Sequence, residues 1–410
     1  MKSGKSVALI YDNLTIKGGA GNVTMWLANR LAARGVTTTV FTTSFNRSLW
    51  PEPLLTGFSV RVLPAFSSNF LTKRSSALKR LLCGAYLSRA LVGYDVLIPH
   101  NNPAIQWVQI AKKLNAALGK VLWFCHEPTR HLFGTVTDPH LFNYEKYGNG
   151  NGSTEHIAAA VRRYQETMKR KARKRARNAR WEIEAASTAS TVVTNSYFCA
   201  RNIERVFSRS AEVVYPGILS IGNGQSASRE LEQRTYIGSV GRLSVRKNIH
   251  NVIEAFGILR NKGIADGLSL KIVGEGPERS VLEKKVIDAG LHDRVSFLGQ
   301  LTDEQLSEFY ANARMIVYTP IDEPFGLVPL ESLYHETPVI VSDHGGPAEI
   351  LTHEKTAYVV NPFDPKSIAE AMARCMQNEH EARQLAENGC ALVKSSFTFD
   401  RFVDHMEHLF

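Results

Sequence analysis

The regular alternation of strand-like and helix-like segments in the second half of this chain constrains its fold more than any other feature. Short apolar runs of strand length each precede a longer segment with helical apolar spacing. The expected strands are residues 236–240, 268–273, 295–298, 315–318 and 339–342, and the expected helices lie near residues 249–261, 278–289, 303–312 and 326–336. This order predicts an α/β domain with a doubly wound parallel sheet, which binds ligands at the carboxyl ends of its strands.

The first half opens with the same kind of pattern. Residues 7–11 are an apolar run, residues 17–22 form a glycine-rich turn, residues 23–33 have helical spacing and residues 37–42 are β-branched. We expect further strands at residues 96–99, 121–125, 191–194 and 212–215, a loop at 143–152 and a long helix over residues 157–187. A length of 410 residues suits two domains of about 200 residues each. The polar segment 220–233 is the expected linker between them.

Basic residues gather in the first half of the chain. Residues 1–232 hold 31 Lys and Arg against 14 Asp and Glu, a balance of +17, whereas residues 233–410 hold 18 against 25, a balance of −7. The excess is concentrated at Lys73-Arg74, at Lys79-Arg80 and in residues 162–180. A basic half indicates an anionic partner, which is a membrane surface, a nucleic acid or a phosphorylated substrate. A solvated helix face is the alternative.

The lengths of the apolar runs and the spacing of the cysteines indicate the cellular compartment of the protein. No apolar run approaches the roughly 18 residues that span a bilayer, and the first one, residues 7–10, is too short for a signal peptide. The five cysteines are widely spaced and odd in number. This pattern disfavours a disulfide framework or a structural zinc site and fits a reducing compartment. We therefore expect a cytoplasmic protein.

The most informative motif is the acidic segment 322–331, Asp-Glu-Pro-Phe-Gly-Leu-Val-Pro-Leu-Glu. Glu323 and Glu331 stand eight residues apart across an expected strand-to-helix turn that contains Gly326. The free backbone N–H groups at the start of the helix suit a phosphate. One carboxylate can accept hydrogen bonds from a ribose diol while the other meets a sugar hydroxyl. Two ordinary surface acids are the alternative interpretation.

A second motif, residues 241–248, follows the first strand of the second half and carries Arg242 and Lys247. These cations can offset the charge of a diphosphate without a metal, Arg242 as a planar fork and Lys247 as a point charge. A solvated basic loop is the alternative. The loops 274–277 and 342–349 also fall at strand ends, where plain turns explain them equally well.

In the first half, the glycines around Gly19 bring backbone close to a ligand, but they do not form an NAD fingerprint. Residues 19–24 lack the third small residue, and the second strand ends without an acid for a ribose. His126 follows a strand and suits contact with a sugar hydroxyl, although a structural histidine fits equally. The histidines show no metal-binding spacing.

Taken in order, these segments resemble glycosyltransferase family 4, also called glycosyl transferases group 1. The resemblance covers nearly the whole chain. Its segments are the N-terminal Gly-Gly loop, His126, residues 194–196, residues 215–217, the Gly-Arg…Lys-Asn segment, residues 295–299 and the acidic E-x7-E motif. It implies the GT-B architecture, in which two facing Rossmann-like domains enclose a cleft. The implied bounds are 1–218 and 234–395, with a linker at 219–233 and a final helix, 396–410, that returns to the first domain.

The resemblance also implies a role for each site residue. Glu331 holds the donor ribose, Glu323 contacts the transferred sugar, and His126 contacts it near the reacting carbon. Arg242 and Lys247 bind the diphosphate. The remaining donor contacts are Gly19, Gly299, Gln300, Phe325, Gly326 and Leu327. The family retains the anomeric configuration without a metal, with the leaving phosphate helping to deprotonate the acceptor.

The implied function is transfer of a hexose from a nucleotide-diphosphate sugar to a lipid-linked or polysaccharide acceptor at the cytoplasmic membrane face. The segment from His126 to Arg130 resembles a subset that transfers mannose and related sugars. One departure is Tyr334-His335-Glu336-Thr337, where the family often has a small-residue turn. A soluble sucrose- or glycogen-type synthase and a non-catalytic sugar-nucleotide-binding protein remain open. No nucleic-acid partner is expected, because the aromatic pattern of an RNA-binding sheet is absent.

Overall fold

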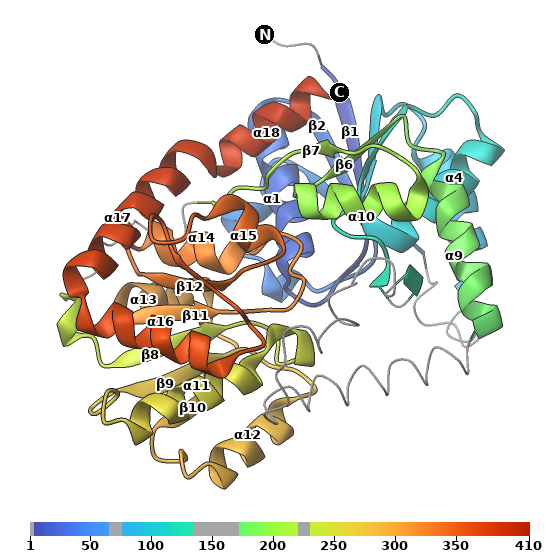
Figure 1. Ribbon diagram of the computed structural model, residues 1–410. Helices are drawn as coiled ribbons and strands as arrows, with labels where there is room; N and C mark the ends of the chain where they lie inside the picture. The colour runs from blue at the N-terminus through green and yellow to red at the C-terminus, as the bar shows by residue number, and fades with distance from the viewer. Residues whose placement is uncertain (1–3, 65–75, 131, 134–171, 220–229) are drawn as a thin grey trace. The chain divides into compact units, whose positions relative to one another are not determined.

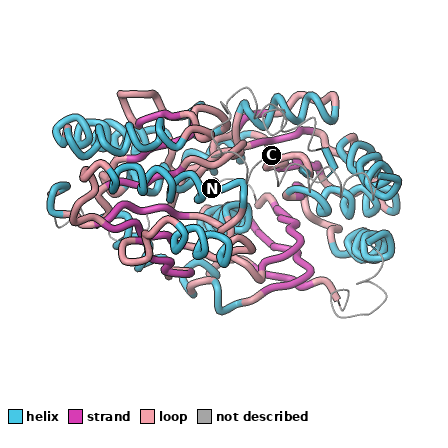
Figure 2. The backbone as a smooth tube through the Cα atoms, turned by 60° about the horizontal axis from the view of Figure 1, so that its bottom comes forward, coloured by secondary structure: helices cyan, strands magenta, loops and turns pink. Residues whose placement is uncertain are grey.

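The computed structural model describes residues 4–64, 76–130, 132–133, 172–219 and 230–410 (Figure 1). These residues form two compact units. The first unit contains the described residues of 1–137, 168–216 and 399–410, and the second contains those of 217–398. Each unit is a parallel sheet with helices on both sides of its strands (Figure 2). The prediction of two α/β domains with parallel sheets is therefore confirmed.

The first unit is built on seven parallel strands in the order β3-β2-β1-β4-β5-β6-β7. Their bounds are β1 Ser6–Leu14, β2 Thr37–Phe45, β3 Ser59–Val62, β4 Val96–Pro99, β5 Lys120–Phe124, β6 Thr191–Thr194 and β7 Glu212–Val213. The chain runs outward from β1 to β3 and then returns to β4 on the other side of β1. The sheet therefore changes direction between β1 and β4. The edge strand β3 was not predicted, because its four residues are largely exposed and carry little apolar signal.

The helices of the first unit are α1 Gly19–Ala33, α3 Ser76–Ala90, α4 Asn101–Leu114, α9 Ala172–Ala186, α10 Tyr197–Phe207 and α18 Phe399–His408, with short 3-10 turns at Arg47–Leu49 and Glu52–Leu55. Helix α1 begins at Gly19, earlier than the predicted residue 23, because Gly18 adopts the extended conformation of an N-cap. Helix α18 packs on α1 through a Trp26–Phe399 ring contact, and Arg34 donates to Asp404 and Glu407 at 2.6 Å each.

The second unit is built on six parallel strands in the order β10-β9-β8-β11-β12-β13. Their bounds are β8 Tyr236–Val240, β9 Ser269–Val273, β10 Val295–Gly299, β11 Met315–Tyr318, β12 Val339–Ser342 and β13 Tyr358–Val360. The prediction placed the first five to within one residue. It missed β13, a three-residue edge strand whose length falls below that of a recognisable apolar run. This sheet changes direction between β8 and β11.

The helices of the second unit are α11 Ile249–Asn261, α12 Arg279–Asp288, α13 Asp303–Asn312, α14 Leu327–Tyr334, α15 Gly346–Ile350, α16 Pro365–Gln377 and α17 Glu379–Ser396, with 3-10 turns at Leu231–Gln233 and Val245–Lys247. Fully buried apolar residues of α11 and α16, such as Phe256 and Met372, pack with strand residues such as Ile272 and Val317 in one core. That core holds the carboxyl ends of the strands, and the loops that follow them, in place.

Several sequence predictions fall outside the described residues. These are the loop at 143–152, the part of the long helix before residue 172, most of the linker and Lys73-Arg74. Within the described ranges, no helix combines the length and the apolar character that crossing a bilayer requires. The five cysteines all lie in described segments, where each is a buried free thiol.

Candidate active site

Two loops meet where the sheet of the second unit changes direction. Lys247 comes from the loop after β8, and Glu323 comes from the loop after β11. The Lys247 Nζ lies 2.7 Å from the Glu323 Oε2 and 2.8 Å from the hydroxyl of Tyr318, the last residue of β11. Both charged side chains are mostly buried, with 22% and 15% exposed. The structure therefore brings together two predicted residues at the position where doubly wound sheets bind ligands.

The backbone after β8 fixes where Lys247 lies. A 3-10 turn, Val245–Lys247, ends at Asn248, which adopts a left-handed conformation with φ 57°. Asparagine tolerates this conformation better than most residues do. Its buried side-chain amide donates to the carbonyls of Thr319 and Pro362 at 3.1 and 2.7 Å. The asparagine thus joins the Lys247 turn to the loop after β11.

Arg246 and Arg242 have different surroundings. Arg246 donates to the carbonyl of Asp322 at 2.8 Å, and the backbone N–H of Ile321 donates to the Arg246 carbonyl at 2.8 Å. Arg246 therefore holds the two loops together. Arg242 is exposed and forms no ion pair with the described residues, so its guanidinium is accessible to a ligand.

Helix α14 begins directly after the acidic loop. Gly326, with φ 92°, is its N-cap, and Leu327 is its first residue. Phe325 is buried with its ring centroid 6.2 Å from that of Phe397. The N–H groups of Leu327 and Val328 have no intrahelical acceptor at the start of the helix. No side chain caps them, so they are available to an anion.

Glu331 lies in the second turn of α14 and is 8% exposed. Its Oε2 accepts a hydrogen bond of 2.7 Å from the hydroxyl of Tyr310. Burial raises the pKa of the Glu331 carboxyl, and it also raises the pKa of the Tyr310 phenol. The carboxylate is therefore held in one orientation by a neutral donor rather than by a cation.

The loop after β12, which the sequence left as a plain turn, supports the acidic loop. The backbone N–H of Gly346 donates to the carbonyl of Glu323 at 2.7 Å. A Cβ atom on Gly345 would lie 2.6 Å from that same carbonyl oxygen. His344 Nε2 lies 3.7 Å from a carboxylate oxygen of the buried Asp322. Only glycines allow this close approach, so residues 342–349 position Glu323.

On the side of β8 away from β11, glycines at the ends of β8, β9 and β10 let the backbone segments approach closely. The N–H of Gly274 donates to the carbonyl of Gly299 at 2.7 Å, and a Cβ on Gly274 would lie 2.1 Å from the Gly241 carbonyl oxygen. Gly299 ends β10, and Gln300 follows it as an exposed residue. These two predicted residues lie at the same sheet edge as Lys247, two strands away from β8.

The first unit contains the two remaining predicted residues. Gly19 is the first residue of α1, and His126 follows β5. The His126 ring is buried with its Nε2 3.1 Å from His100 Nδ1, and its backbone N–H donates to Asn101 Oδ1. Burial lowers the pKa of His126 to about 3. Its imidazole is therefore neutral near pH 7, so it can offer a ligand hydrogen bonds but no charge.

Sequence reasoning missed Tyr310, Tyr318, Arg246 and His344 as parts of this site. Tyr318 was detectable, because it is the last residue of an expected strand directly before the acidic motif. Tyr310 had no local signal, since it reaches Glu331 from a different helix. Across the described ranges, no three His, Cys, Asp or Glu side chains gather as metal ligands.

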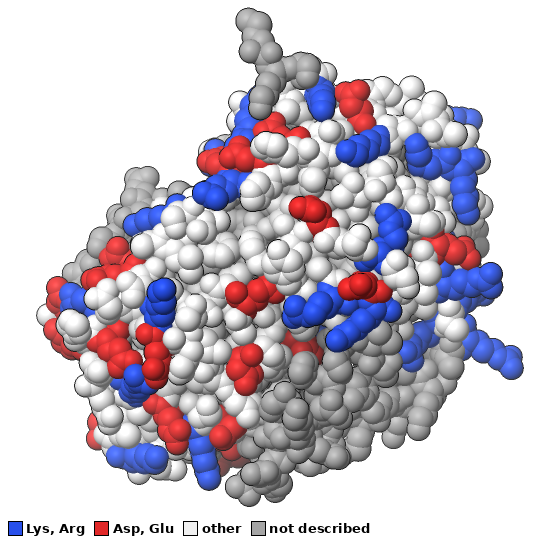
Figure 3. Space-filling model, turned by 45° about the horizontal axis from the view of Figure 1, so that its top comes forward, with Lys and Arg blue, Asp and Glu red and all other residues white. Residues whose placement is uncertain are grey.

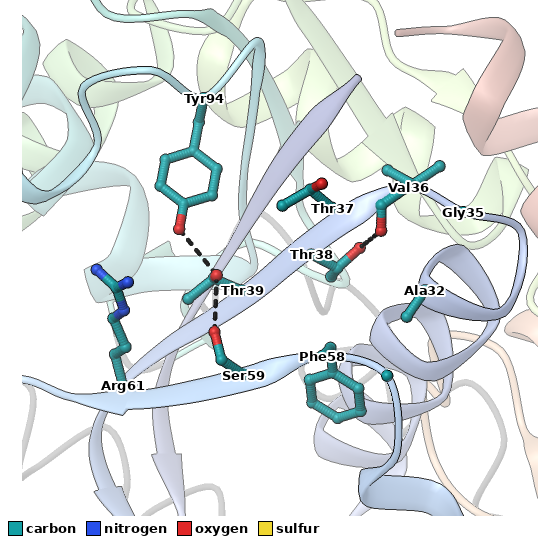
Figure 4. Close-up of a pocket in the computed structure, with 11 residues that line it drawn as sticks. Ala32, Gly35, Val36, Thr37, Thr38, Thr39, Phe58, Ser59, Arg61 and Tyr94 are labelled. Carbon is teal, nitrogen blue, oxygen red and sulfur yellow. Dashed lines mark hydrogen bonds between the residues drawn. The ribbon is translucent and has the colours of Figure 1, made fainter. Parts of the chain in front are cut away.

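The first unit has a shallow hollow of about 580 Å³ beside the amino ends of its strands β2 and β3 (Figure 4). Its hydroxyl groups bond to one another, with the Tyr94 hydroxyl 2.8 Å from the Thr39 Oγ1, which lies 2.9 Å from the Ser59 Oγ. Because these groups satisfy each other, we assign no ligand to this hollow.

Comparisons with known proteins cover both units. The family model Glycosyltransferase Family 4 matches residues 17–218, and the model Glycosyl transferases group 1 matches residues 224–391. Over 241 residues the chain is 28% identical to Alpha-1,3/1,6-mannosyltransferase ALG2 of Mus musculus. The aligned region covers 53% of this chain and 57% of that protein. Over 191 residues it is 34% identical to the O-antigen chain mannosyltransferase RfbU of Salmonella typhimurium, covering 45% and 51%.

The chain thus spans about half the length of these curated relatives. Among solved structures it is similar to HepE of Anabaena in complex with UDP and glucose, with a TM-score of 0.74, 18% identity and 99% of each chain covered. That likeness shows the fold. Because the two family models together match nearly the whole chain in consecutive order, this chain belongs to glycosyltransferase family 4, the glycosyl transferases group 1.

Proposed function

We propose that this protein is a retaining glycosyltransferase. It moves a hexose from a nucleotide-diphosphate sugar to a lipid-linked or polysaccharide acceptor. The observation that carries the proposal is the largely buried Lys247–Glu323 pair, which lies where the sheet changes direction and directly before the uncapped start of α14. A cation beside free backbone N–H groups suits a diphosphate, and the nearby carboxylates suit sugar hydroxyls.

In this proposal each residue of the second unit has one contact with the donor. Arg242, Lys247 and the N–H groups after Gly326 bind the diphosphate, so its charge is offset without a metal. Glu331 accepts hydrogen bonds from the ribose diol. Glu323 contacts the hexose, and its carboxylate is already oriented by Lys247. Gly299, Gln300, Phe325 and Leu327 complete the donor pocket.

The proposed reaction is the one that the family resemblance implies. The bond between the anomeric carbon and the diphosphate oxygen breaks, and a bond from the acceptor oxygen forms on the same face of that carbon. The acceptor hydroxyl gives its proton to the leaving diphosphate. Lys247 and Arg242 stabilise the charge that develops on the leaving group, which is the main source of rate enhancement. The family resemblance assigns contact with the transferred sugar to His126, which is neutral, and a place near the donor to Gly19.

Mannose is the hexose that the relatives favour. Two of the matched proteins, ALG2 and RfbU, are mannosyltransferases by name. RfbU acts on the O-antigen chain, which is consistent with a polysaccharide or lipid-linked acceptor. The resemblance of residues 126–130, from His126 to Arg130, to a mannose-transferring subset supports the same choice.

The function is tested by a transfer screen. The purified chain is incubated with GDP-mannose, UDP-glucose, UDP-galactose or UDP-N-acetylglucosamine and a lipid extract, and sugar-bearing products are identified by mass spectrometry. We expect transfer from GDP-mannose, with the α-configuration retained, and full activity in EDTA. Transfer to a soluble sugar in the absence of lipid would favour a sucrose- or glycogen-type synthase. Absence of both hydrolysis and transfer with all four donors would contradict an enzymatic function.

We also propose that the basic first half holds the enzyme on an anionic, cytoplasmic membrane face. The charge balance of residues 1–232 supports this, as do Arg173, Arg177 and Arg180, which are exposed on α9. Two residues of the predicted basic surface, however, form contacts with other side chains of the first unit. Lys79 pairs with Asp12 at 3.0 Å, and Arg80 stacks 3.4 Å from the Trp181 ring centroid. On the face drawn in Figure 3, acidic side chains lie between many of the basic ones.

A further inference from the structure

Two histidines of the first unit form a buried pair. His100 follows β4 and is 1% exposed, and His126 follows β5 and is 7% exposed. The Nδ1 of His100 lies 3.1 Å from the Nε2 of His126, which is a hydrogen-bonding distance. Because β4 and β5 are neighbours in the sheet, their carboxyl ends bring the two imidazoles together. His100 has no role in the site described so far.

Neighbouring groups hold both rings in place. The His100 ring stacks on Phe124 with 5.3 Å between the ring centroids, and the Phe124 ring also lies 4.5 Å from that of His126. The backbone of His126 is fixed as well. Its N–H donates to Asn101 Oδ1 at 2.8 Å, and its carbonyl accepts from Cys199 Sγ at 3.0 Å. These contacts determine how the two imidazoles are oriented toward each other.

The hydrogen bond between the imidazoles allows two arrangements of their protons. Burial lowers the pKa of His126 to about 3 and lowers the pKa of His100 well below its usual value. Both rings are therefore neutral near pH 7, and each carries one N–H. Either His100 Nδ1–H donates to His126 Nε2, or His126 Nε2–H donates to His100 Nδ1. Both histidines carry the proton on Nδ1 in the first arrangement and on Nε2 in the second.

The other ring nitrogen of His100 distinguishes the two arrangements. This Nε2 is buried and has no hydrogen-bond partner among the described residues. If His100 accepted the hydrogen bond, its own proton would lie on Nε2 as a buried N–H without an acceptor. If His100 donates, Nε2 is an unprotonated nitrogen with an unused lone pair. Buried N–H groups without a partner are rare, and unused acceptor lone pairs are more common. His100 is therefore the donor.

We propose that His100 is a positioning residue that fixes His126 in the Nδ1–H tautomer. His126 then offers a ligand a hydrogen-bond donor, because its Nε2 is occupied by His100 and its Nδ1 forms no hydrogen bond with a described residue. A ring in this state can donate to a sugar oxygen but cannot act as a general base through Nδ1. The tautomer rests on the contacts of the pair, whereas the sugar as ligand rests on the proposed function.

The tautomers are tested by NMR on the full chain with ¹⁵N-labelled histidine rings. Long-range ¹H–¹⁵N spectra at about pH 7 distinguish protonated from unprotonated ring nitrogens by their ¹⁵N chemical shifts. His100→Ala and His126→Gln identify the two residues by the signals that disappear among those of the 13 histidines. We expect Nδ1–H for both residues in the wild type. In His100→Ala, water can enter beside His126 and can donate or accept, so the Nε2–H form of His126 should appear.

Kinetics connect the tautomer to the reaction. Because His126 is assigned to the transferred sugar, His100→Ala should lower kcat about fivefold, the effect of one hydrogen bond, and leave the KM of the nucleotide sugar unchanged. The matched control is His405→Phe, which replaces a histidine exposed on α18 of the same unit. It should change neither kcat nor the His126 signals.

The outcomes separate this inference from the proposed function. Nδ1–H signals from both histidines, in a chain that transfers no sugar, support the positioning role of His100 and contradict the transferase. An active transferase in which both histidines are Nε2–H overturns the inference alone. A His126 tautomer or a kcat that His100→Ala leaves unchanged also overturns it. Thermal melting establishes that each variant is folded. His100→Gln, which fills more of the same space and can donate or accept, replaces His100→Ala should that variant not fold.

Discussion

At the scale of single residues, Lys247 gives the sharpest test of the donor site. Its Nζ contacts Glu323 and Tyr318, and we propose that it binds the diphosphate. Truncating one partner of a buried, hydrogen-bonded charge pair costs about 2–5 kcal/mol, so Lys247→Ala should lower kcat/KM for the donor at least tenfold. The measurement is steady-state kinetics, with Lys284→Ala as control because Lys284 is 77% exposed on α12. Unchanged kinetics in Lys247→Ala would remove Lys247 from the site.

Glu182 makes a prediction about pH and stability. It is 1% exposed, and burial raises the pKa of its carboxyl from 4.5 to about 7. Between pH 4.5 and pH 7 the Glu182 carboxyl is ionised in the unfolded chain but still protonated in the folded chain. The free energy of unfolding therefore falls as the pH rises through this range, and Glu182 causes no further fall above pH 7. The total is about 3 kcal/mol.

Glu182→Gln removes this titration. The free energy of unfolding of the variant and of the wild type is measured with urea at pH 5, 6, 7 and 8. The difference, variant minus wild type, should increase by about 3 kcal/mol from the lowest pH to the highest. The glutamine also changes the hydrogen bonds to Thr129 and Asn102, but that effect is the same at every pH. If the free energies of unfolding of the variant and the wild type change equally with pH, the prediction for Glu182 is wrong.

At the scale of structural elements, the loop between β12 and α15 determines where Glu323 lies. Gly345 has φ 81° and ψ −164°, which essentially only glycine adopts, and a Cβ there would meet the Glu323 carbonyl. Gly267 has a similar φ of 79° with nothing within 4 Å of an added Cβ. Gly267 therefore serves as a control: it is a glycine with positive φ that lies away from the site and whose added Cβ would meet no neighbour.

Gly267→Ala should cost about 1 kcal/mol of stability and leave donor binding intact. Gly345→Ala should cost about 2 kcal/mol more and weaken the binding of nucleoside diphosphate at least tenfold, because Glu323 and its partner Lys247 must move. Thermal unfolding and titration calorimetry measure the two effects. Equal behaviour of the two variants would mean that this loop does not position the site.

At the scale of the whole molecule, the uneven charge predicts salt-sensitive membrane binding. Each Lys or Arg near an anionic surface contributes about 1 kcal/mol, so Arg173→Glu with Arg177→Glu should weaken vesicle binding at least thirtyfold. Arg175 is not a suitable target, because its Nε donates to the Leu132 carbonyl. Co-sedimentation with phosphatidylglycerol vesicles at low and high salt is the measurement. Lys262→Glu with Lys284→Glu, on the second unit, is the control. Equal binding to neutral vesicles would contradict the proposal.

Local sequence patterns were enough to predict most of the helices and strands and to propose residues for the donor site. Helix α11 was predicted at its observed bounds, since its apolar period is local and its start and end carry turn signals. Lys247 and Glu323 were singled out as candidates because each lies a few residues after an expected strand end, and Glu331 because it follows Glu323 at a fixed spacing. Such information needs only neighbouring residues, so it can be read along the chain.

Which of these residues contact one another, and which are buried, depends on the folded arrangement of the strands. Lys247 and Glu323 lie 76 residues apart in sequence and pair because the order of strands places β8 beside β11. Lys79 and Arg80 read as surface charges, yet folding places them against Asp12 and Trp181. Contacts of this kind depend on strand order and on burial of distant segments. Local propensity determines each helix or strand, whereas the packing of the whole sheet determines the partners, the exposure and the pKa of its side chains.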